Sequence, residues 1–427
     1  MFVLNSPYKG GTHLPDITVV KPIFYQQKIA FFTAARGHHA DIGGITPGSM
    51  PPMSQSIEQE GVIIEPMKLV VSAVFQTEAI SELLMACQYP SRNVLQNIAD
   101  LKAQVAACEA GQSAILTLIS QLGFPVVSVY MQYVKDYAEM SVRRLLAALK
   151  DGHFTTYLDD GAKIQVLLKF DAQKQTAIID FKGTSEAHTG NFNAPESVCK
   201  AAILYVFRCL IDEPIPLNAG FFRPLEIIIP KGSMLSPEYP AAVVSGNVET
   251  SQNIVDCLLG ALGKLAASQG TCNNLTFGDA DYQYYETLCG GAGAGDGFAG
   301  ASAVHTHMTN SRLTDPEILE QRFPVLLTQF GIRGDSGGEG EFSGGNGVFR
   351  RIQFLKPMTV AIISSHRKVK PFGLAGGAAG SVGENWWIAA GSAEKVLLKH
   401  CDQLDVATGD SIEIRTPGGG GYGRKKT

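Results

Sequence analysis

The sequence predicts an α+β fold in which mixed β-sheets are combined with a helical segment. Strand-like stretches cluster at the start and after residue 150, a run with helical spacing lies between them, and strands do not alternate regularly with helices. Regular alternation is what a doubly wound parallel sheet requires, so elements in blocks favour α+β. The expected regions are a β-rich region at 1–80, a helical segment at 81–150, a meander with one helix at 151–245 and an α+β region at 246–427.

The first region contains short apolar runs that are typical of strands. The strands expected there are 2–4, 17–24 and 28–35. The polar pair Gln26-Gln27 separates the last two runs and predicts that they form a hairpin. A polar, glycine-rich loop is expected from 37 to 53.

The helical segment shows apolar residues at helical spacing, for example at Ile98, Leu101 and Val105, and three helices are expected within it. After residue 150, alternating and apolar runs predict strands at 154–158, 163–170, 176–181, 225–229, 350–355 and 360–364, and helices at 194–211 and 250–268.

Composition excludes several classes of protein. Lys and Arg number 35 against 40 Asp and Glu, so bulk positive charge does not point to nucleic-acid binding. No run approaches the roughly 20 apolar residues of a membrane span, and no secretory signal precedes the first strand, which together predict a cytoplasmic protein away from the membrane. The eight cysteines include no C-x-x-C pair, which argues against a zinc ribbon or a thioredoxin-type redox pair.

Two H-x-x-D units are the best local signal of chemistry. They are His13 to Asp16 and His38 to Asp41, both in polar loops beside expected strands. Imidazole and carboxylate together suit Zn²⁺, Mn²⁺ or Fe²⁺. If the two strands pair as a hairpin, both units lie at the same end of it. The alternative is that each unit arose by chance and that its His and Asp share a hydrogen bond.

The glycine tract at 290–300 contains a formal G-x-G-x-x-G between Gly295 and Gly300. A dinucleotide fingerprint should follow a strand and begin a helix, and the continuation here indicates loop or strand, so a scaffold of tight turns is favoured. The Walker pattern G-x-x-x-x-G-K-[ST] is absent from the sequence. We therefore expect no ATP site of that type in this chain.

A second histidine pair, His305 and His307, lies on one side of an expected extended segment and precedes Arg312. These side chains could form the other wall of an active site, with Arg312 binding an anionic group through charge-assisted hydrogen bonds. The alternative is a structural turn before a helix that starts around Thr314-Asp315-Pro316-Glu317, with Thr314 as the hydroxyl cap.

Longer runs of sequence resemble the hydantoinase B family, which is also the C-terminal half of ATP-dependent 5-oxoprolinase. The matching runs are NSPYKGGTHLPD (5–16), RGHHADIGG (36–44), DLKAQ (100–104), NNLT (273–276), YET (285–287), HTHMTN (305–310), DPEILE (315–320) and GGGGYG (418–423). They occur in order along the whole chain. Such ordered agreement is far more specific than any one motif.

The resemblance implies the B component of an ATP-dependent amidohydrolase. In that scheme a hydantoinase A-like ATPase partner binds ATP and phosphorylates the cyclic amide, and the B component completes the opening of 5-oxoproline to glutamate at a metal-bearing site. The similar acetone carboxylases imply that His13, Asp16 and His38 hold a divalent Zn, Mn or Fe ion. We expect Asp41, His305, His307 and Arg312 to act on the substrate.

Two alternatives remain open at this stage. The substrate could be a hydantoin or another lactam, because the pocket walls are not visible in sequence order. The chain could also be a non-catalytic subunit that shapes a shared site in a larger oligomer. Two features depart from the family. Members carry a further segment before the turn at 5–8, and within that turn Ser6 stands where an Asp is usual. We therefore expect a shortened or split member.

Overall fold

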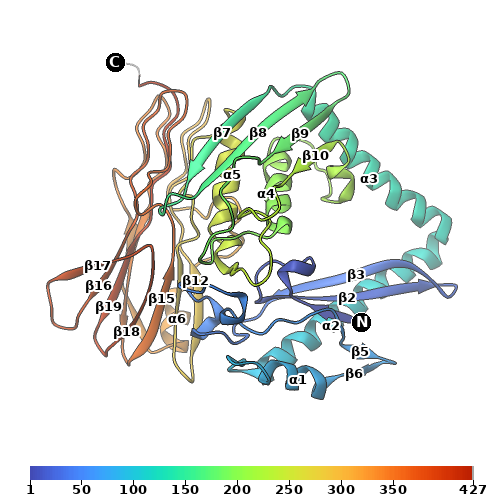
Figure 1. Ribbon diagram of the computed structural model, residues 1–427, viewed down its shortest axis with the longest axis horizontal. Helices are drawn as coiled ribbons and strands as arrows, with labels where there is room; N and C mark the ends of the chain where they lie inside the picture. Colours follow the sequence, from blue (N-terminus) through green and yellow to red (C-terminus); the bar gives the residue numbers. More distant parts are fainter. Residues whose placement is uncertain (426–427) are drawn as a thin grey trace.

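The computed structural model describes residues 1–425 and confirms the α+β fold, with several β-sheets arranged around two central helices and a pair of long helices at one side (Figure 1). The N-terminal sheet has the order β3-β2-β1-β4. Its strands are β1 (Phe2–Leu4), β2 (Asp16–Tyr25), β3 (Lys28–His38) and β4 (Met67–Lys68), and a ribbon of β5 (Val70–Val71) and β6 (Val74–Phe75) follows.

The predicted hairpin is formed by β2 and β3. Gln26 and Gln27 have φ of 48° and 62°, the left-handed conformation that two-residue hairpin turns need at both positions. Ile17, Val19 and Ile23 of β2 are fully buried, as expected for a strand with one face toward a core. The hairpin is longer than the sequence predicts, because β3 continues to His38 and takes the start of the expected loop into the sheet.

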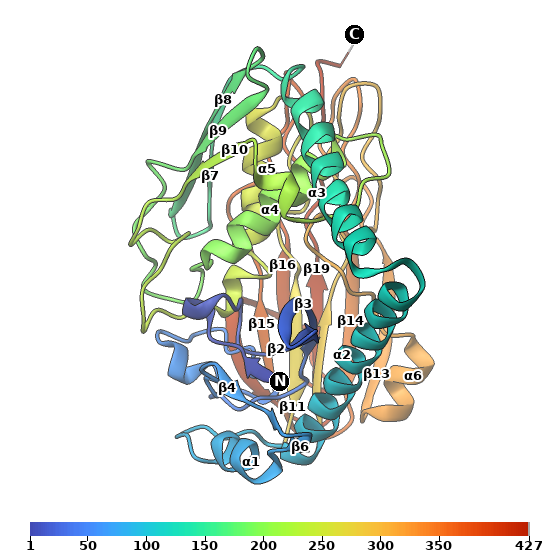
Figure 2. The same cartoon turned by 90° about the vertical axis from the view of Figure 1, so that its right-hand side faces the viewer.

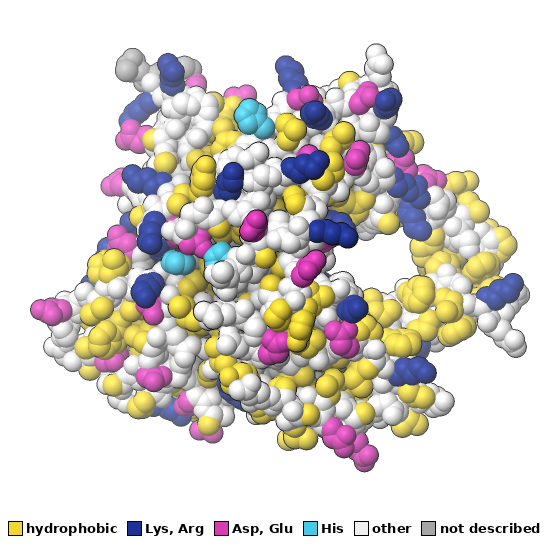
Figure 3. Space-filling model, viewed as in Figure 1, with side chains coloured by type: hydrophobic (Ala, Val, Ile, Leu, Met, Phe, Trp, Pro, Cys, Tyr) yellow, Lys and Arg dark blue, Asp and Glu magenta, His cyan; other side chains and the backbone are white. Residues whose placement is uncertain are grey.

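The three expected helices are α1 (Thr77–Met85), α2 (Val94–Leu122) and α3 (Phe124–Leu146). Gly123, with φ of 82°, separates α2 from α3 and lets the chain bend there by 116°. The two helices form an arm that projects from the body, and apolar side chains gather on it (Figures 1 and 3). Within residues 1–425, no single helix has the length and apolarity to cross a membrane, and α2 with α3 meets that test only as a bent pair.

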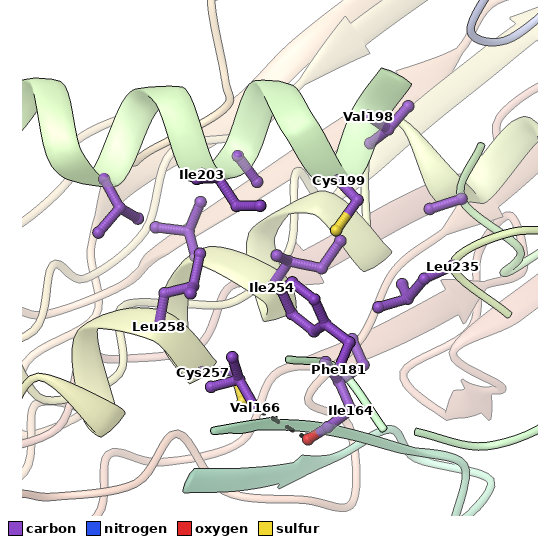
Figure 4. Close-up of a cluster of buried hydrophobic side chains, with 14 of the residues drawn as sticks. Ile164, Val166, Phe181, Val198, Cys199, Ile203, Leu235, Ile254, Cys257 and Leu258 are labelled. Carbon is purple, nitrogen blue, oxygen red and sulfur yellow. Dashed lines mark hydrogen bonds between the residues drawn. The ribbon is translucent and has the colours of Figure 1, made fainter. Parts of the chain in front are cut away.

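A second sheet and two helices form the middle of the molecule. The sheet has the order β10-β9-β8-β7, with β7 (Gly152–Tyr157), β8 (Lys163–Asp171), β9 (Thr176–Asp180) and β10 (Leu225–Ile228), and the helices are α4 (Glu196–Cys209) and α5 (Thr250–Ala261). Side chains of α4 and α5 meet those of β8 in one core, in which Ile203, Leu258 and Val166 are fully buried (Figure 4). Single 3₁₀ turns lie at η1 (Pro7–Lys9), η2 (Pro47–Ser49), η3 (Ile57–Gln59), η4 (Ala219–Phe222) and η5 (Val244–Gly246).

The expected helix at 250–268 is too long. α5 ends at Ala261, and Gly263 follows in the left-handed conformation, with φ of 64°, which is a common way for a helix to stop. The apolar residues beyond it, among them Ala266 and Ala267, are buried without being helical.

The C-terminal part contains two sheets that share a third core. Their orders are β12-β11-β15-β18 and β13-β14-β19-β16-β17. The strands are β11 (Asn274–Gly278), β12 (Gln283–Thr287), β13 (Val325–Ile332), β14 (Val348–Phe354), β15 (Met358–Ile363), β16 (Glu384–Ile388), β17 (Lys395–Leu398), β18 (Cys401–Val406) and β19 (Ser411–Arg415). Only β14 and β15 are among the strands expected from the sequence. Figure 2 shows the N-terminal hairpin in front of these strands.

The helix expected after Thr314 is α6 (Pro316–Arg322), but Asp315 caps it instead of Thr314. The Asp315 carboxylate accepts from the Glu317 amide, and the Thr314 hydroxyl is bonded to Tyr284.

The glycine tracts pack backbone against backbone, as a scaffold of tight turns. A Cβ built on Gly345 would lie 1.9 Å from the Ala301 oxygen, and one on Gly419 would lie 1.9 Å from the Ala292 oxygen. Neither position has room for a side chain. Glycine is therefore required at both, because another segment of the backbone passes close by.

Candidate metal centre

The β2–β3 hairpin brings the first H-x-x-D unit against the start of the second. Asp16 is the first residue of β2 and is directly opposite His38, the last residue of β3. His13 lies one turn before Asp16, and the Asp16 amide donates to the His13 carbonyl at 3.1 Å. The short turn at the far end of the hairpin and a β-bulge between Ile23 and Phe24, which shifts the pairing by one residue, together set the register that joins the two units.

Three donor atoms converge at this end of the hairpin, and we call them the triad: Nε2 of His13, Oδ1 of Asp16 and Nδ1 of His38. Their separations are 3.3 Å between the two nitrogens, 3.5 Å from His13 to Asp16 and 3.1 Å from His38 to Asp16. Ligands of one tetrahedral ion with bonds of about 2.0 to 2.2 Å lie about 3.4 Å apart. The triad therefore fits a single divalent ion.

The electrostatics leave His13 and Asp16 in the protonation states that metal binding needs. Burial lowers the pKa of His13 to about 4, so its imidazole is neutral. Burial acts to raise the pKa of Asp16, but the charge interaction with His13 and hydrogen bonds from His38 and Thr12 hold it well below its ordinary value. A neutral imidazole and an ionised carboxylate are the ligand forms of these side chains.

Neighbouring side chains hold the triad in place. The second carboxylate oxygen of Asp16 accepts from Thr12 Oγ1 at 3.0 Å and from Asn247 Nδ2 at 3.3 Å, which leaves Oδ1 directed at the two imidazoles. The ring of Tyr285 stacks on that of His38, with centroids 5.6 Å apart. Such neighbours of metal ligands fix ring orientation and tune affinity.

A chain of hydrogen bonds leads from Tyr285, whose ring stacks on His38, to a buried carboxyl group. The Tyr285 hydroxyl donates to Asn274 Oδ1, and Asn274 Nδ2 donates to Glu249 Oε1, both at 2.8 Å. The Cys272 amide also donates to that oxygen at 3.1 Å. The sequence does not identify Asn247, Asn274, Tyr285 or Glu249 as site residues, although the runs NNLT and YET already carry the family resemblance.

Glu249 gives the chain a pH-dependent stability. Burial raises its pKa to about 8, so the folded state binds a proton that the unfolded state releases near pH 4.5. The stability that Glu249 contributes is greatest below pH 4.5 and is lost as pH rises to about 8. We expect Glu249→Gln to reduce this loss by on the order of a few kcal/mol, as measured by urea unfolding at pH 5 and pH 8.

The matched control for Glu249→Gln is Glu82→Gln, on the exposed face of α1, which should leave the pH dependence as it is in the wild type. Equal pH slopes for wild type and Glu249→Gln would contradict the prediction.

Asp41 and His39 lie outside the triad, and each is held by other residues of the chain. The Asp41 carboxylate accepts from the amides of Gly43, Gly48 and Arg92 and forms an ion pair with Arg92 at 3.0 Å. His39 is buried and bonded to Gln104 and Asn97 of α2. The two ends of the second H-x-x-D unit therefore have different roles: His38 belongs to the triad, whereas Asp41 holds the loop after β3 in place.

The second histidine pair also has surroundings of its own. His307 contacts Asp256 at 3.1 Å and Tyr205 at 3.3 Å, whereas Nδ1 of His305 is buried with no hydrogen-bond partner in the described chain. Arg312 is exposed. The roles of these residues and of Asp41 on a substrate stay predictions.

The segment 305–312, which carries both histidines and Arg312 and is called the strip below, approaches the metal centre a few residues beyond His307. Thr309 contacts Cys272, and Ser311 is bonded to Thr287, which lies in the same strand, β12, as Tyr285.

Comparison with known proteins gives consistent matches along the chain. The family model described as hydantoinase B/oxoprolinase matches residues 1–425. 5-Oxoprolinase 1 of Arabidopsis thaliana is 47% identical over 99% of this chain, which spans about a third (35%) of that protein. The B component of a putative D-/L-hydantoinase from Pseudomonas sp. is 28% identical, with 98% of this chain and 75% of that protein covered.

A solved structure has the same fold. The crystal structure of ATP-dependent caprolactamase from Pseudomonas jessenii superimposes with a TM-score of 0.88 at 25% identity, covering 99% of this chain and 77% of that one.

Proposed function

Because the chain belongs to the hydantoinase B/oxoprolinase family, we propose that it is the B component of an ATP-dependent cyclic amidohydrolase that opens 5-oxoproline to glutamate. The observation that carries this proposal is the triad, whose three donor atoms lie 3.1 to 3.5 Å apart. The relatives named 5-oxoprolinase and caprolactamase act on lactams, which supports the substrate class.

The triad would hold a divalent Zn, Mn or Fe ion, which when bound supplies a Lewis acid that polarises an oxygen and lowers the pKa of water. Asp16 contributes a negative charge. The hydrogen bonds from Thr12 and Asn247 to its Oδ2 fix the orientation of the carboxylate, so that Oδ1 points toward the two imidazoles. His13 is buried, whereas 35% of the His38 side chain is exposed. The substrate would therefore approach from the His38 side, where the Tyr285 ring limits the approach of water.

The strip after the glycine tract supplies the second wall in this proposal. Its contacts through Thr309 and Ser311 bring it beside β12, and the exposed Arg312 has a guanidinium free to bind a carboxylate or phosphate oxygen. His305 and His307 would transfer protons during ring opening.

The activation step belongs to a partner in this proposal. The sequence contains no Walker pattern, the chain spans about a third of the plant 5-oxoprolinase, and the Pseudomonas relative is named as one component of a larger enzyme. We infer a hetero-oligomer with a hydantoinase A-like ATPase, which would bind ATP and phosphorylate the lactam.

The test is reconstitution of the two components. The purified chain alone should hydrolyse no ATP, and mixing it with an A-type ATPase should give 5-oxoproline-dependent release of glutamate and phosphate. Hydantoin and caprolactam are the comparison substrates. ATP turnover by the isolated chain, or an A component that opens the ring equally well without this chain, would contradict the proposal.

A further inference from the structure

A pocket outside the triad lies between α4, the end of α5 and the glycine tract. Its volume is about 460 Å³, and its apolar walls include Val206 of α4 and Leu265 just after α5. The tract contributes a tight turn at Gly297, where φ is 85°, and this turn sets Asp296 and Phe298 at the pocket. Leu265 forms a β-bridge with Gly295, which fixes the turn against the end of α5. The G-x-G-x-x-G segment thus forms part of a pocket wall, which is a different role from the binding of a nucleotide.

The polar part of the pocket is a buried Asp256–His307 pair that orients Tyr205. The side chains of Asp256 and His307 are 2% and 6% exposed, and Nε2 of His307 lies 3.1 Å from Asp256 Oδ1. With the carboxylate as acceptor, Nε2 carries the proton and Nδ1 accepts from the Tyr205 hydroxyl at 3.3 Å. The phenolic oxygen of Tyr205, which also interacts with the Cys209 side chain, can then accept a hydrogen bond from a ligand.

Two further features set this pair apart from an ordinary buried ion pair, although Asp256 itself does not line the pocket. Asp256 Oδ2 is buried and has no hydrogen-bond partner in the part of the chain that the structure describes. Buried polar atoms are almost always paired, so an unpaired one calls for an explanation. His307 also has φ of 48°, a conformation that a residue with a side chain adopts at a cost and that is often found at functional sites.

Opposite charges lie at the same pocket. Lys264 and Asp296 both line it and both are exposed. Among residues 1–425 neither has an ion-pair partner, and they do not pair with one another. A free ammonium and a free carboxylate at one pocket complement the carboxylate and ammonium groups of a zwitterion.

We propose that this pocket binds a zwitterionic α-amino acid whose side chain ends in a neutral hydrogen-bond donor. Lys264 binds its carboxylate, Asp296 binds its ammonium group, and the apolar walls cover its methylene groups. The Tyr205 oxygen accepts from a side-chain N–H, which an amide side chain supplies and a carboxylate side chain does not. L-glutamine fits this description better than L-glutamate, and no triad residue lines the pocket.

The test is calorimetric titration of the full chain with amino acids. L-glutamine should bind, whereas L-glutamate and 4-carbamoylbutanoate, which lacks the α-amino group, should each bind at least tenfold more weakly. Lys264→Met and Asp296→Asn should each weaken glutamine binding at least tenfold, and Tyr205→Phe should weaken binding of glutamine but not of L-norleucine. Lys28→Met, at the tip of the β2–β3 hairpin, is the matched control, and circular dichroism confirms folding of each variant.

Three outcomes would overturn the proposal: no heat from glutamine with the folded wild-type chain, glutamine affinity unchanged in both Lys264→Met and Asp296→Asn, or loss of binding in His13→Ala, which would place the ligand at the triad. Because the titration needs neither ATP nor the partner, failure of lactam hydrolysis would leave its result unaffected.

Discussion

Replacing His13 by alanine is expected to remove the divalent ion and to lower the rate of reconstituted lactam opening by on the order of a thousandfold. His13 is the buried member of the triad, and its neutral imidazole is 3.3 Å from His38 and 3.5 Å from Asp16. Two ligands seldom hold an ion that three hold firmly, since catalytic sites of this type use three protein ligands. Metal content, measured by mass spectrometry of the purified protein, should fall from about one ion per chain to none.

The control for this experiment is His153→Ala, because His153 is exposed on β7 and far along the chain from the triad. It should retain both metal and activity. Asp16→Asn tests the same site without opening a cavity, since it keeps the shape and removes the charge. Full metal occupancy in His13→Ala would show that the three donors form a hydrogen-bonded cluster with no metal role.

Replacing Arg350 by methionine is expected to lower the free energy of unfolding by about 3 to 5 kcal/mol. Arg350 and Glu286 form a buried ion pair between β14 and β12, with two hydrogen bonds of 2.9 and 3.1 Å. Their side chains are 2% and 1% exposed, so the single substitution leaves a carboxyl group buried without its charge partner. Burial already raises the pKa of Glu286, which shows the cost of ionising this group in the core. Urea unfolding measures the loss.

Two further variants separate this cause from a general packing defect. Arg350→Met combined with Glu286→Gln removes both charges and should recover much of the loss. Arg144→Met breaks an ion pair of similar length, 3.1 Å to Glu213, whose side chains are 53% and 41% exposed, and it should cost less than about 1 kcal/mol. Similar losses for Arg350→Met and Arg144→Met would contradict the argument from burial.

The sequence by itself predicts the α+β class and places His13, Asp16 and His38 at the same end of a hairpin. The two-residue turn Gln26-Gln27 brings the residues that flank the two strands to the same end of the hairpin. The exact pairing of Asp16 with His38 also depends on the β-bulge between Ile23 and Phe24, which the sequence does not predict. The helices of the arm follow equally from spacing along a continuous run of residues.

Only the tertiary structure decides which residues surround the triad. Asp41 lies only three residues after His38 in the second H-x-x-D unit, but its carboxylate is held by Arg92, 51 residues away. Tyr285 reaches His38 because β11, β12 and β15 assemble from segments that are far apart in the chain. His307 is held by Asp256, which lies in α5, 51 residues earlier in the chain. Pairing over such separations depends on burial and on the packing of whole sheets, and periodicity along one segment carries no record of the partner.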